Sequence, residues 1–462
     1  MERIEIRDLY KSYKDFGGKT ITVCGWARTI RDSKNIAFVS LNDGAFNCLQ
    51  IVVEREKVAN YDEVVKQTVG SSFKVEGEVI LTPEAQQPFE INAKAVEVLG
   101  SSDVDYPLQK KRHTIEFLRT IPTIRPRGNL FNAVFRIRSV AAFAIHKFFN
   151  ERNFVYIHTP IITASDCEGA GEMFQVTTLD MDNLPKNDGK IDYSQDFFGK
   201  KVALTVSGQL HEETITHAFG KTYTFGPTFR AENSNTSRHA AEFWMMEPEM
   251  CFCDIEGLMN NEEEMIKYVI SYVMKECSAE IEFLNKFVDT GLIERLNNIV
   301  NNAFVRLDYT EAIEILLNSK EKFEFPVKWG IDLQSEHERY LTEKVYQKPV
   351  FLKNYPKDIK AFYMRQNDDG KTVAAVDLLV PGVGELIGGS QREERLDKLT
   401  QRMKELGLKK EDYSWYIDTR RYGTNVHSGY GLGFERLIMY LTGVSNIRDV
   451  ELFPRTVGGI QG

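Results

Sequence analysis

The sequence predicts an α+β protein in which a small closed β-barrel precedes a larger domain built on an antiparallel sheet flanked by helices. Two observations predict this fold. In the first hundred residues, apolar side chains alternate with period two in five short runs, which is typical of the strands of a small barrel. Beyond residue 129, strand-like and helix-like segments follow in mixed order without regular βαβ alternation, which favours an antiparallel sheet over a doubly wound parallel one.

Composition excludes several classes of protein. The 462 residues, 42% hydrophobic and 27% charged, can bury a large core and divide into two or more domains. The first ten residues lack the apolar core of a signal peptide, and no uncharged stretch of about 18 residues could cross a membrane. Six cysteines without C-x-x-C spacing indicate neither a disulfide scaffold nor a zinc site. We therefore expect a cytoplasmic protein without membrane association.

The five alternating runs cover residues 20–28, 36–41, 46–53, 73–81 and 89–98. A polar, helix-compatible stretch between the third and fourth runs matches the layout of an OB-fold. In the second run Ala37, Val39 and Leu41 share the expected core face, so Phe38 points outward. An outward aromatic beside Arg28 and Gln50 suits stacking on a nucleic-acid base, although a lone exposed phenylalanine is also common without such a role.

Domain boundaries follow from the proline-rich and basic stretch after the barrel. We predict a barrel domain over residues 1–102, a linker over 103–128, and a second domain over 129–462 with a mainly helical insertion around 255–350. Between residues 110 and 127, six Lys or Arg residues stand against one acid, which fits either a solvated connector or a nucleic-acid contact. Residues 129–150 have helical apolar spacing and require a partner surface.

Three segments of the second domain carry candidate chemistry. The first is the helix at 129–150 followed by a strand that ends near Pro160. The second, residues 224–249, is predicted as strand, polar loop and strand, with Arg230 and Glu232 on one sheet face because they are two residues apart. An arginine fork suits an α-phosphate, a carboxylate can accept from an adenine amine, and Phe243 could stack on the base. A surface salt bridge would explain Arg230 and Glu232, but not the whole loop.

The third segment, residues 429–439, is a glycine-rich strand that turns into a helix. Glycines let a flat ligand approach the backbone closely, and Arg436 near the helix start adds positive charge for a terminal phosphate. Close packing of helix on strand would explain the glycines equally well. The chain has neither a P-loop nor the third glycine of a dinucleotide fingerprint, so a nucleotide would need another scaffold.

In this order, and joined to an OB-fold, the three segments resemble the signature motifs of class II aminoacyl-tRNA synthetases. The resemblance covers essentially the whole chain, and the leading OB-fold is typical of the aspartyl, asparaginyl and lysyl subgroup. Residues 225–249, 354–363, 388–395 and 431–454 are similar to the bacterial asparaginyl enzymes in particular. The resemblance implies ATP-dependent activation of L-asparagine, transfer to tRNA(Asn), a homodimer formed around the first motif, and Mg²⁺ held with ATP.

The resemblance also implies residue roles. Arg230 and Arg436 would be the catalytic arginines. The residues implied at the ATP site are Arg230, Glu232, Arg238, His239, Phe243, Glu385 and Arg436, with Asp377 and Glu385 as metal ligands. The segment between Asp377 and Glu385 is one residue longer than in typical aspartyl relatives, and Asp377 alone could equally be a helix cap or surface acid. Arg28, Phe38 and Gln50 would contact the anticodon, which the family recognises as GUU.

The implied amino-acid site contains Glu168, Ser207, Gln209, Glu247 and Arg392. Gln209 and Glu168 match groups that hold the α-ammonium, and residues 165–174 would form a mobile flap. Arg392 matches the residue that contacts the side-chain carbonyl oxygen, and Glu247 could accept from the carboxamide nitrogen, directly or through water. An aspartate side chain would place a second carboxylate beside Glu247, which is unfavourable in a dry pocket.

Other functions remain open at this point. An aspartyl enzyme, including one that charges both tRNAs, is disfavoured because Glu212 stands where aspartyl enzymes carry a lysine. A lysyl enzyme would need acids where Arg392 stands. A noncatalytic RNA-binding relative would be expected to lose Arg230 and Arg436, and a tRNA-independent asparagine synthetase of related fold would lack the barrel.

Overall fold

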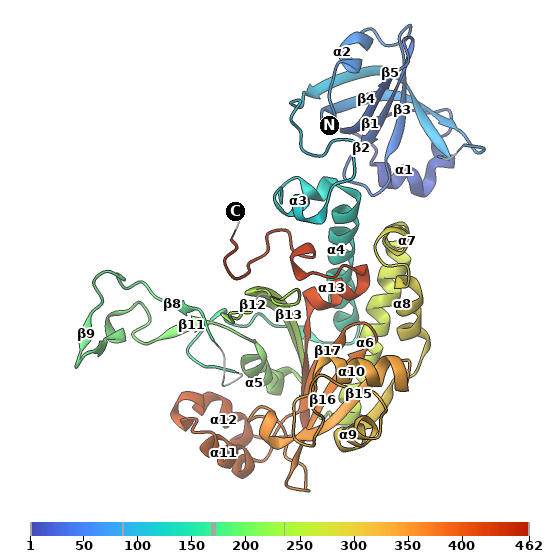
Figure 1. The fold of residues 1–462 in the computed structure, drawn as a ribbon. Helices are drawn as coiled ribbons and strands as arrows, with labels where there is room; N and C mark the ends of the chain where they lie inside the picture. Colours follow the sequence, from blue (N-terminus) through green and yellow to red (C-terminus); the bar gives the residue numbers. More distant parts are fainter. Residues whose placement is uncertain (1, 86, 168–171, 235, 461–462) are drawn as a thin grey trace. The chain divides into compact units, whose positions relative to one another are not determined.

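The computed structural model describes residues 2–85, 87–167, 172–234 and 236–460. The chain forms two compact units, Met1–Phe135 and Arg136–Gly462. Figure 1 shows the elements of each unit. Within the described residues, no helix has the length and apolar character needed to cross a membrane.

The first unit contains the predicted closed barrel, with strand order β1-β2-β3-β5-β4. Its strands are β1 (Thr20–Asp32), β2 (Ile36–Asn42), β3 (Leu49–Glu54), β4 (Ser72–Leu81) and β5 (Phe89–Gly100). Its helices are α1 (Ile6–Ser12), η1 (Tyr13–Phe16), α2 (Tyr61–Val65), α3 (Ile115–Arg119) and η2 (Arg125–Arg127). Strand β3 begins three residues later than predicted, because the Asn42 and Asp43 side chains accept from the amides of Gly44 and Ala45 and hold a turn.

The second strand of the barrel has the predicted alternation. Ala37, Val39 and Leu41 are buried in the barrel core. Phe38 is half-buried and lies on the opposite face of β2. The side-chain period of a strand thus leaves one aromatic ring outside the core, as expected.

The second unit contains an eight-stranded sheet of order β14-β15-β16-β17-β18-β13-β12-β6. The bounds are β6 (Val155–Tyr156), β12 (Lys221–Phe229), β13 (Glu242–Cys251), β14 (Val305–Asp308), β15 (Val350–Pro356), β16 (Thr372–Val380), β17 (Gly384–Gln391) and β18 (His427–Gly433). Only the outer pairs β14–β15 and β12–β6 are parallel among these described strands, and the rest pair antiparallel, which confirms the predicted sheet type.

Helices surround this sheet. They are α4 (Asn129–Asn150), α5 (Gln209–Phe219), α6 (Ile255–Glu276), α7 (Ser278–Phe287), α8 (Leu292–Asn301), α9 (Tyr309–Leu317), α10 (Ser335–Arg339), α11 (Leu396–Glu405), α12 (Ser414–Arg421) and α13 (Phe434–Thr442). Shorter turns are η3 (Tyr193–Gln195), the π-helix η4 (Tyr340–Val345), η5 (Lys357–Ile359), η6 (Lys410–Tyr413) and η7 (Ile447–Asp449). Helix α4 has the predicted bounds, and its apolar residues Val134, Ile137, Ala141, Ile145 and Phe148 are fully buried.

A small three-stranded sheet and a hairpin lie beside α5. The small sheet has order β7-β11-β8, formed by β7 (Ile162–Thr163), β11 (Val202–Leu204) and β8 (Gln175–Val176). The hairpin is β9 (Lys186–Asn187) with β10 (Lys190–Ile191), and Figure 1 shows it projecting beyond β8 and β11. Strand β11 leads directly into the loop before α5.

The main sheet has two different faces at β17. A Cβ atom at Gly389 would lie 3.0 Å from Glu262 of α6, whereas one at Gly388 would face Glu385 and Asp377. Because successive residues of a strand point to opposite faces, α6 covers one face and the acidic groups lie on the other. The register between β16 and β17 shifts at Leu378/Leu379: Leu378 pairs with Ile387 and Leu379 with Glu385, so the bulge is at Leu386.

Candidate active site

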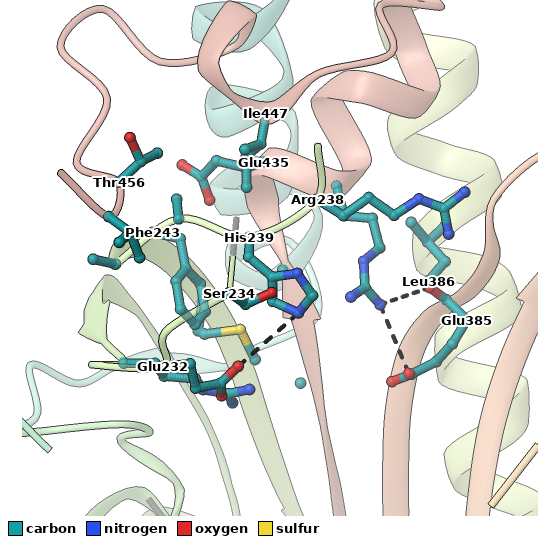
Figure 2. A pocket seen from close by; sticks show the side chains of 18 residues that line it. Glu232, Ser234, Arg238, His239, Phe243, Glu385, Leu386, Glu435, Ile447 and Thr456 are labelled. Atoms are coloured by element: carbon teal, nitrogen blue, oxygen red, sulfur yellow. Dashed lines mark hydrogen bonds and ion pairs between the residues drawn. The ribbon is translucent and has the colours of Figure 1, made fainter. Parts of the chain in front are cut away.

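A cavity of about 890 Å³ opens on the acidic face of the sheet. It is lined by every residue that the sequence implies at the ATP site: Arg230, Glu232, Arg238, His239, Phe243, Glu385 and Arg436. Figure 2 shows Glu232, His239 and Phe243 on one side of the cavity, with Arg238 and Glu385 on the other. Strand β18, with glycines at 431 and 433, forms part of the cavity wall.

Arg230 follows β12 rather than lying within it. The strand ends at Phe229, so the prediction that Arg230 and Glu232 share a sheet face is wrong, because both belong to the loop. The Arg230 guanidinium lies 5.3 Å from the Phe243 ring centroid. Its Nε is buried and has no hydrogen-bond partner among the described residues, and the Arg230 side chain lines the cavity.

The other two arginines are held by backbone carbonyls near β17. Arg436 donates to the Glu385 carbonyl at 2.8 Å, and its guanidinium lies 3.7 Å from the Glu385 carboxylate. Arg238 donates to the Val383 carbonyl at 3.1 Å. Burial lowers the pKa of Arg238, and the nearby charge of Arg436 lowers it further. Two cations held this close together favour a bound anion such as a phosphate chain.

The opposite side of the cavity has the character of a base-binding site. Phe243 lies in β13, opposite Thr228 of β12. His239 and Glu232 approach to 4.0 Å across the loop. The amide of Trp244, next to Phe243, donates to the Glu435 carboxylate at 2.9 Å. This bond connects the phenylalanine platform to the start of α13.

A second cavity of about 930 Å³ adjoins the first. Four residues line both cavities: Arg230, Met245, Glu385 and Gly431. Ser207, Gln209, Glu247, Asp377 and Arg392 line the second cavity, together with Lys360 and Tyr363. The structure therefore brings Arg392 and Glu247 to one cavity, and Arg230 stands at the junction of the two cavities.

Glu247 is held by the loop that precedes α5. One carboxylate oxygen accepts from the Ser207 hydroxyl, and the other accepts from the Gly208 amide at 2.9 Å. The Ser207 hydroxyl also accepts from the Gln209 amide at 3.1 Å. Donors of residues 207 and 208 thus hold the Glu247 carboxylate at the N-terminus of α5.

Arg392 forms a buried ion pair with Glu249. Its Nη2 and Nε both donate to the Glu249 carboxylate, the latter at 3.2 Å, and its Nη1 donates to the Ser390 hydroxyl at 2.8 Å. The Glu249 carboxylate occupies the space that a Cβ at Gly429 would need. Burial alone would lower the pKa of Arg392, but the charge of Glu249 raises it well above its ordinary value. The guanidinium is therefore charged.

Asp377 and Glu385 face each other across Gly388. A Cβ at Gly388 would lie 3.1 Å from a Glu385 oxygen and 3.4 Å from an Asp377 oxygen. Burial raises the pKa of Glu385, and the charge of Asp377 raises it further. Lys360 donates to Asp377 at 2.9 Å. The described residues contain no group of three or more His, Cys, Asp or Glu side chains arranged to hold a metal ion.

Glu212, next to Glu213 on α5, is fully buried near Glu247 and Glu249. Burial raises its pKa to about 9, and the charges of Glu249 and Glu247 contribute in the same direction. Its carboxyl is therefore protonated at neutral pH. A neutral acid stands at the position where the sequence comparison with aspartyl enzymes expects a lysine.

In the barrel, the expected base-stacking surface contains a different arginine. Arg31 lies opposite Phe38 across β1 and β2, with its guanidinium 5.8 Å from the ring centroid. Gln50 pairs with Ser40 on the neighbouring strand and donates to Glu90 at 2.9 Å. Arg28 instead donates to Asn129 at 3.0 Å.

One predicted site residue, Glu168, lies outside the described residues, as do three others of the 165–174 segment. Sequence reasoning missed Glu249, Lys360, Tyr363 and Glu338. Glu338 of α10 accepts from the Glu385 amide at 3.2 Å, and burial raises its pKa to about 8. Lys360 and Tyr363 belong to the stretch 354–363 that carried the family resemblance, so that stretch was a signal for them.

Two family models match two separate parts of the chain. Residues 117–457 match tRNA synthetases class II (D, K and N), and residues 21–99 match an OB-fold nucleic acid binding domain. The asparagine–tRNA ligases of Clostridium acetobutylicum and Clostridium novyi are each 62% identical to this chain, with 100% and 99% of both chains covered, respectively.

Solved structures agree. An asparaginyl-tRNA synthetase from Pyrococcus horikoshii complexed with asparaginyl-adenylate matches with a TM-score of 0.86 and 30% identity over 100% of both chains. The Entamoeba histolytica asparaginyl-tRNA synthetase in complex with asparaginyl-adenylate matches with a TM-score of 0.82 and 29% identity, covering 96% of this chain and 97% of that one. The chain therefore belongs to the asparagine–tRNA ligase family of class II (D, K and N) tRNA synthetases.

Proposed function

We propose that this protein activates L-asparagine with ATP to form asparaginyl-adenylate and transfers the asparaginyl group to the 3′ end of tRNA(Asn). The observation that carries this proposal is the pair of adjoining cavities with Arg230 at their junction. One cavity has cations and an aromatic platform for ATP. The other has the groups expected to bind the amino acid. Their junction is where a carboxylate would meet an α-phosphate.

In the first step, a carboxylate oxygen of asparagine attacks the α-phosphorus, and pyrophosphate leaves. The amino-acid carboxylate is ionised at neutral pH, so no protein base is required and catalysis depends on positioning and charge stabilisation. Arg230, whose Nε has no partner among the described residues, would hold the α-phosphate. In the second step, a terminal ribose hydroxyl attacks the activated carbonyl carbon, and AMP leaves.

ATP would lie along the first cavity. Phe243 would stack on adenine, and Glu232 would accept from its amine. His239, Arg238 and Arg436 would bind the terminal phosphates. The Glu232 and His239 side chains are both half-exposed and line the cavity, so both can reach a bound nucleotide.

Asp377 and Glu385 suit a Mg²⁺ ion that accompanies ATP. Carboxylate oxygens are hard ligands, and a nucleotide-bound magnesium usually keeps few protein ligands. The raised pKa of Glu385 reflects burial and repulsion from Asp377, both of which a divalent cation would relieve. When bound, the ion would neutralise charge on the phosphates.

Selection of asparagine would use both ends of its carboxamide. Arg392 has its guanidinium in the second cavity and would donate to the side-chain carbonyl oxygen, while Glu247 would accept from the amide nitrogen. A carboxylate side chain would meet the Glu247 charge instead. Since Glu249 already neutralises Arg392, that guanidinium does not compensate for a second acid.

We also propose a cytoplasmic homodimer that contacts the anticodon through the barrel face around Phe38. Exposed aromatic side chains on α4, β6 and β13 support a dimer interface, because Phe143, Tyr156 and Trp244 are 58%, 51% and 39% exposed. Analytical ultracentrifugation would test the dimer. The half-exposed Phe38 ring with Arg31 beside it supports the anticodon contact.

The decisive experiment is ATP–pyrophosphate exchange with a panel of amino acids. Asparagine should support exchange by orders of magnitude above the rest, and aminoacylation should follow with tRNA(Asn). Equal exchange with aspartate would instead indicate an aspartyl or nondiscriminating enzyme. Absence of exchange with either amino acid would remove the proposal.

A further inference from the structure

A buried charged cluster lies behind the second cavity, between α5, α12 and β18. Its centre is Glu213, which is fully buried and lies one turn after Gln209 on α5. Arg420 Nη2 and His427 Nε2 both contact one Glu213 oxygen, the histidine at 2.9 Å. The Tyr416 hydroxyl lies 2.9 Å from both Glu213 oxygens. The cluster is anchored further because Arg420 Nε donates to the Glu393 carbonyl at 2.9 Å.

This environment keeps Glu213 ionised. Burial by itself would raise the pKa of Glu213, but the charge of Arg420 and the contacts with His427 lower it well below its ordinary value. An ionised carboxylate only accepts hydrogen bonds. Any amide group in contact with it must therefore present its nitrogen.

Gln209 is the amide in contact. Its Nε2 donates to Glu213 at 3.2 Å, and its Oε1 accepts from the Cys167 thiol at 3.8 Å. The residue lines the second cavity. The orientation of a glutamine amide depends on its hydrogen-bond partners, and here an acceptor-only partner determines it. With the nitrogen held by Glu213, the carbonyl oxygen, which the Cys167 thiol also contacts, is the end that can accept from a ligand.

We propose that Glu213 is a positioning residue that keeps the Gln209 amide with its carbonyl oxygen toward the α-ammonium of the amino-acid substrate. The inference rests on the proposed function, in which Gln209 meets that ammonium. Without the carboxylate, the amide can turn by half a rotation and present its NH₂ group to a cation. An attractive contact then becomes a repulsive one, and the effect concerns the ammonium alone.

The binding of three ligands distinguishes this positioning role from general structural support of the pocket. L-asparagine carries the ammonium, carboxylate and carboxamide; L-asparaginol lacks the carboxylate; succinamic acid lacks the ammonium. Dissociation constants would be measured calorimetrically, or as inhibition constants in pyrophosphate exchange. For Glu213→Gln, asparagine and asparaginol should each weaken at least about 10-fold, as expected for loss of a hydrogen bond to a charged group. Succinamic acid should change less than about 2-fold, since it makes no such bond.

The substitution leaves Arg420 buried without its partner, so folding needs a second variant. The double variant Glu213→Gln/Arg420→Met removes both charges and should show the same selective pattern, with thermal unfolding confirming a folded chain. In a Gln209→Ala background, Glu213→Gln should have no further effect on asparagine. Glu282→Gln, on the exposed surface of α7, is the control for glutamate substitution.

The outcomes are distinct. Equal weakening of all three ligands would mean that Glu213 only supports the pocket, and no weakening would mean that Gln209 is oriented without it; either result overturns the inference. If the unsubstituted protein failed to bind asparagine, the proposed function itself would be wrong. If it bound asparagine and the variants were nonselective, only the role of Glu213 would fall.

Discussion

Arg392 is paired with Glu249, while Glu247, two residues earlier on the same strand, accepts from Ser207 and Gly208. The two glutamates point to the same sheet face because they are two residues apart in β13. Glu249 neutralises the guanidinium, and Glu247 is the residue that we propose contacts the carboxamide of asparagine. Because Glu249 balances the charge of Arg392 in this division of roles, the cavity contains both a charged arginine and the acceptor Glu247. It therefore carries no net positive charge from Arg392, and such a charge would favour aspartate.

Substitution of Glu247 tests this division. Glu247→Gln removes the charge that opposes an aspartate side chain, so the ratio of kcat/KM for asparagine over aspartate should fall by at least about 10-fold. Pyrophosphate exchange with each amino acid measures the ratio. Glu282→Gln should leave it unchanged. An unchanged ratio in Glu247→Gln would remove this residue from amino-acid selection.

Gly429 should be required for the Arg392–Glu249 pair. A Cβ there would overlap the Glu249 carboxylate, so Gly429→Ala should displace Glu249 and reduce kcat/KM for asparagine at least about 10-fold, a cost typical of disturbing a buried ion pair. ATP binding, measured by fluorescence titration or calorimetry, should change little. Gly226→Ala is the matched control, because nothing lies within 4 Å of a Cβ at that strand position. Full activity of Gly429→Ala would contradict the argument.

The protonated state of Glu212 predicts a pH-dependent stability. Its pKa is raised from 4.5 to about 9, so the folded chain keeps a proton that the unfolded chain loses. The corresponding stability is present below pH 4.5 and is lost as pH rises through about 9. The Glu212→Gln variant has no carboxyl at this position and does not lose this stability as the pH rises. The unfolding free energy of the variant minus that of the unsubstituted protein should therefore increase by about 1 kcal/mol per pH unit between pH 6 and 8. Melting temperatures across this range test it, with Glu282→Gln as control. A difference independent of pH would show that Glu212 is ionised in the folded protein.

Phe38 should affect only the tRNA step. Stacking on a base contributes about 1–3 kcal/mol, so Phe38→Ala should lower kcat/KM for tRNA(Asn) roughly 5- to 150-fold. Pyrophosphate exchange should be unaffected, because Phe38 lies in the barrel unit and lines neither cavity. Phe287→Ala, an exposed aromatic on α7, provides the control. Equal loss of both activities would refute the assignment.

Local periodicity accounts for what could be predicted of the fold. The barrel strands, the helix Asn129–Asn150 and the glycine-rich strand before α13 each follow from patterns within one segment. Where a strand is irregular, the same rule fails. Register shifts between Ala27 and Thr29 in β1, which leaves Arg28 at the bulge and places Arg31 opposite Phe38. Similarly, β12 ends before Arg230, which cancels the expected shared face with Glu232.

By itself, the sequence determined the α+β class and the barrel followed by an antiparallel sheet, because residue spacing and the three motifs are local properties of the chain. It also predicted residues that line one cavity and that we propose bind ATP. Only the tertiary structure decided that Arg392 pairs with Glu249 and that Lys360 reaches Asp377. It also decided that Glu213 contacts Gln209, Arg420 and His427. Most of these contacts join residues far apart in sequence, and their partners are chosen by strand register and by the need to neutralise buried charge. No spacing along the chain specifies that choice.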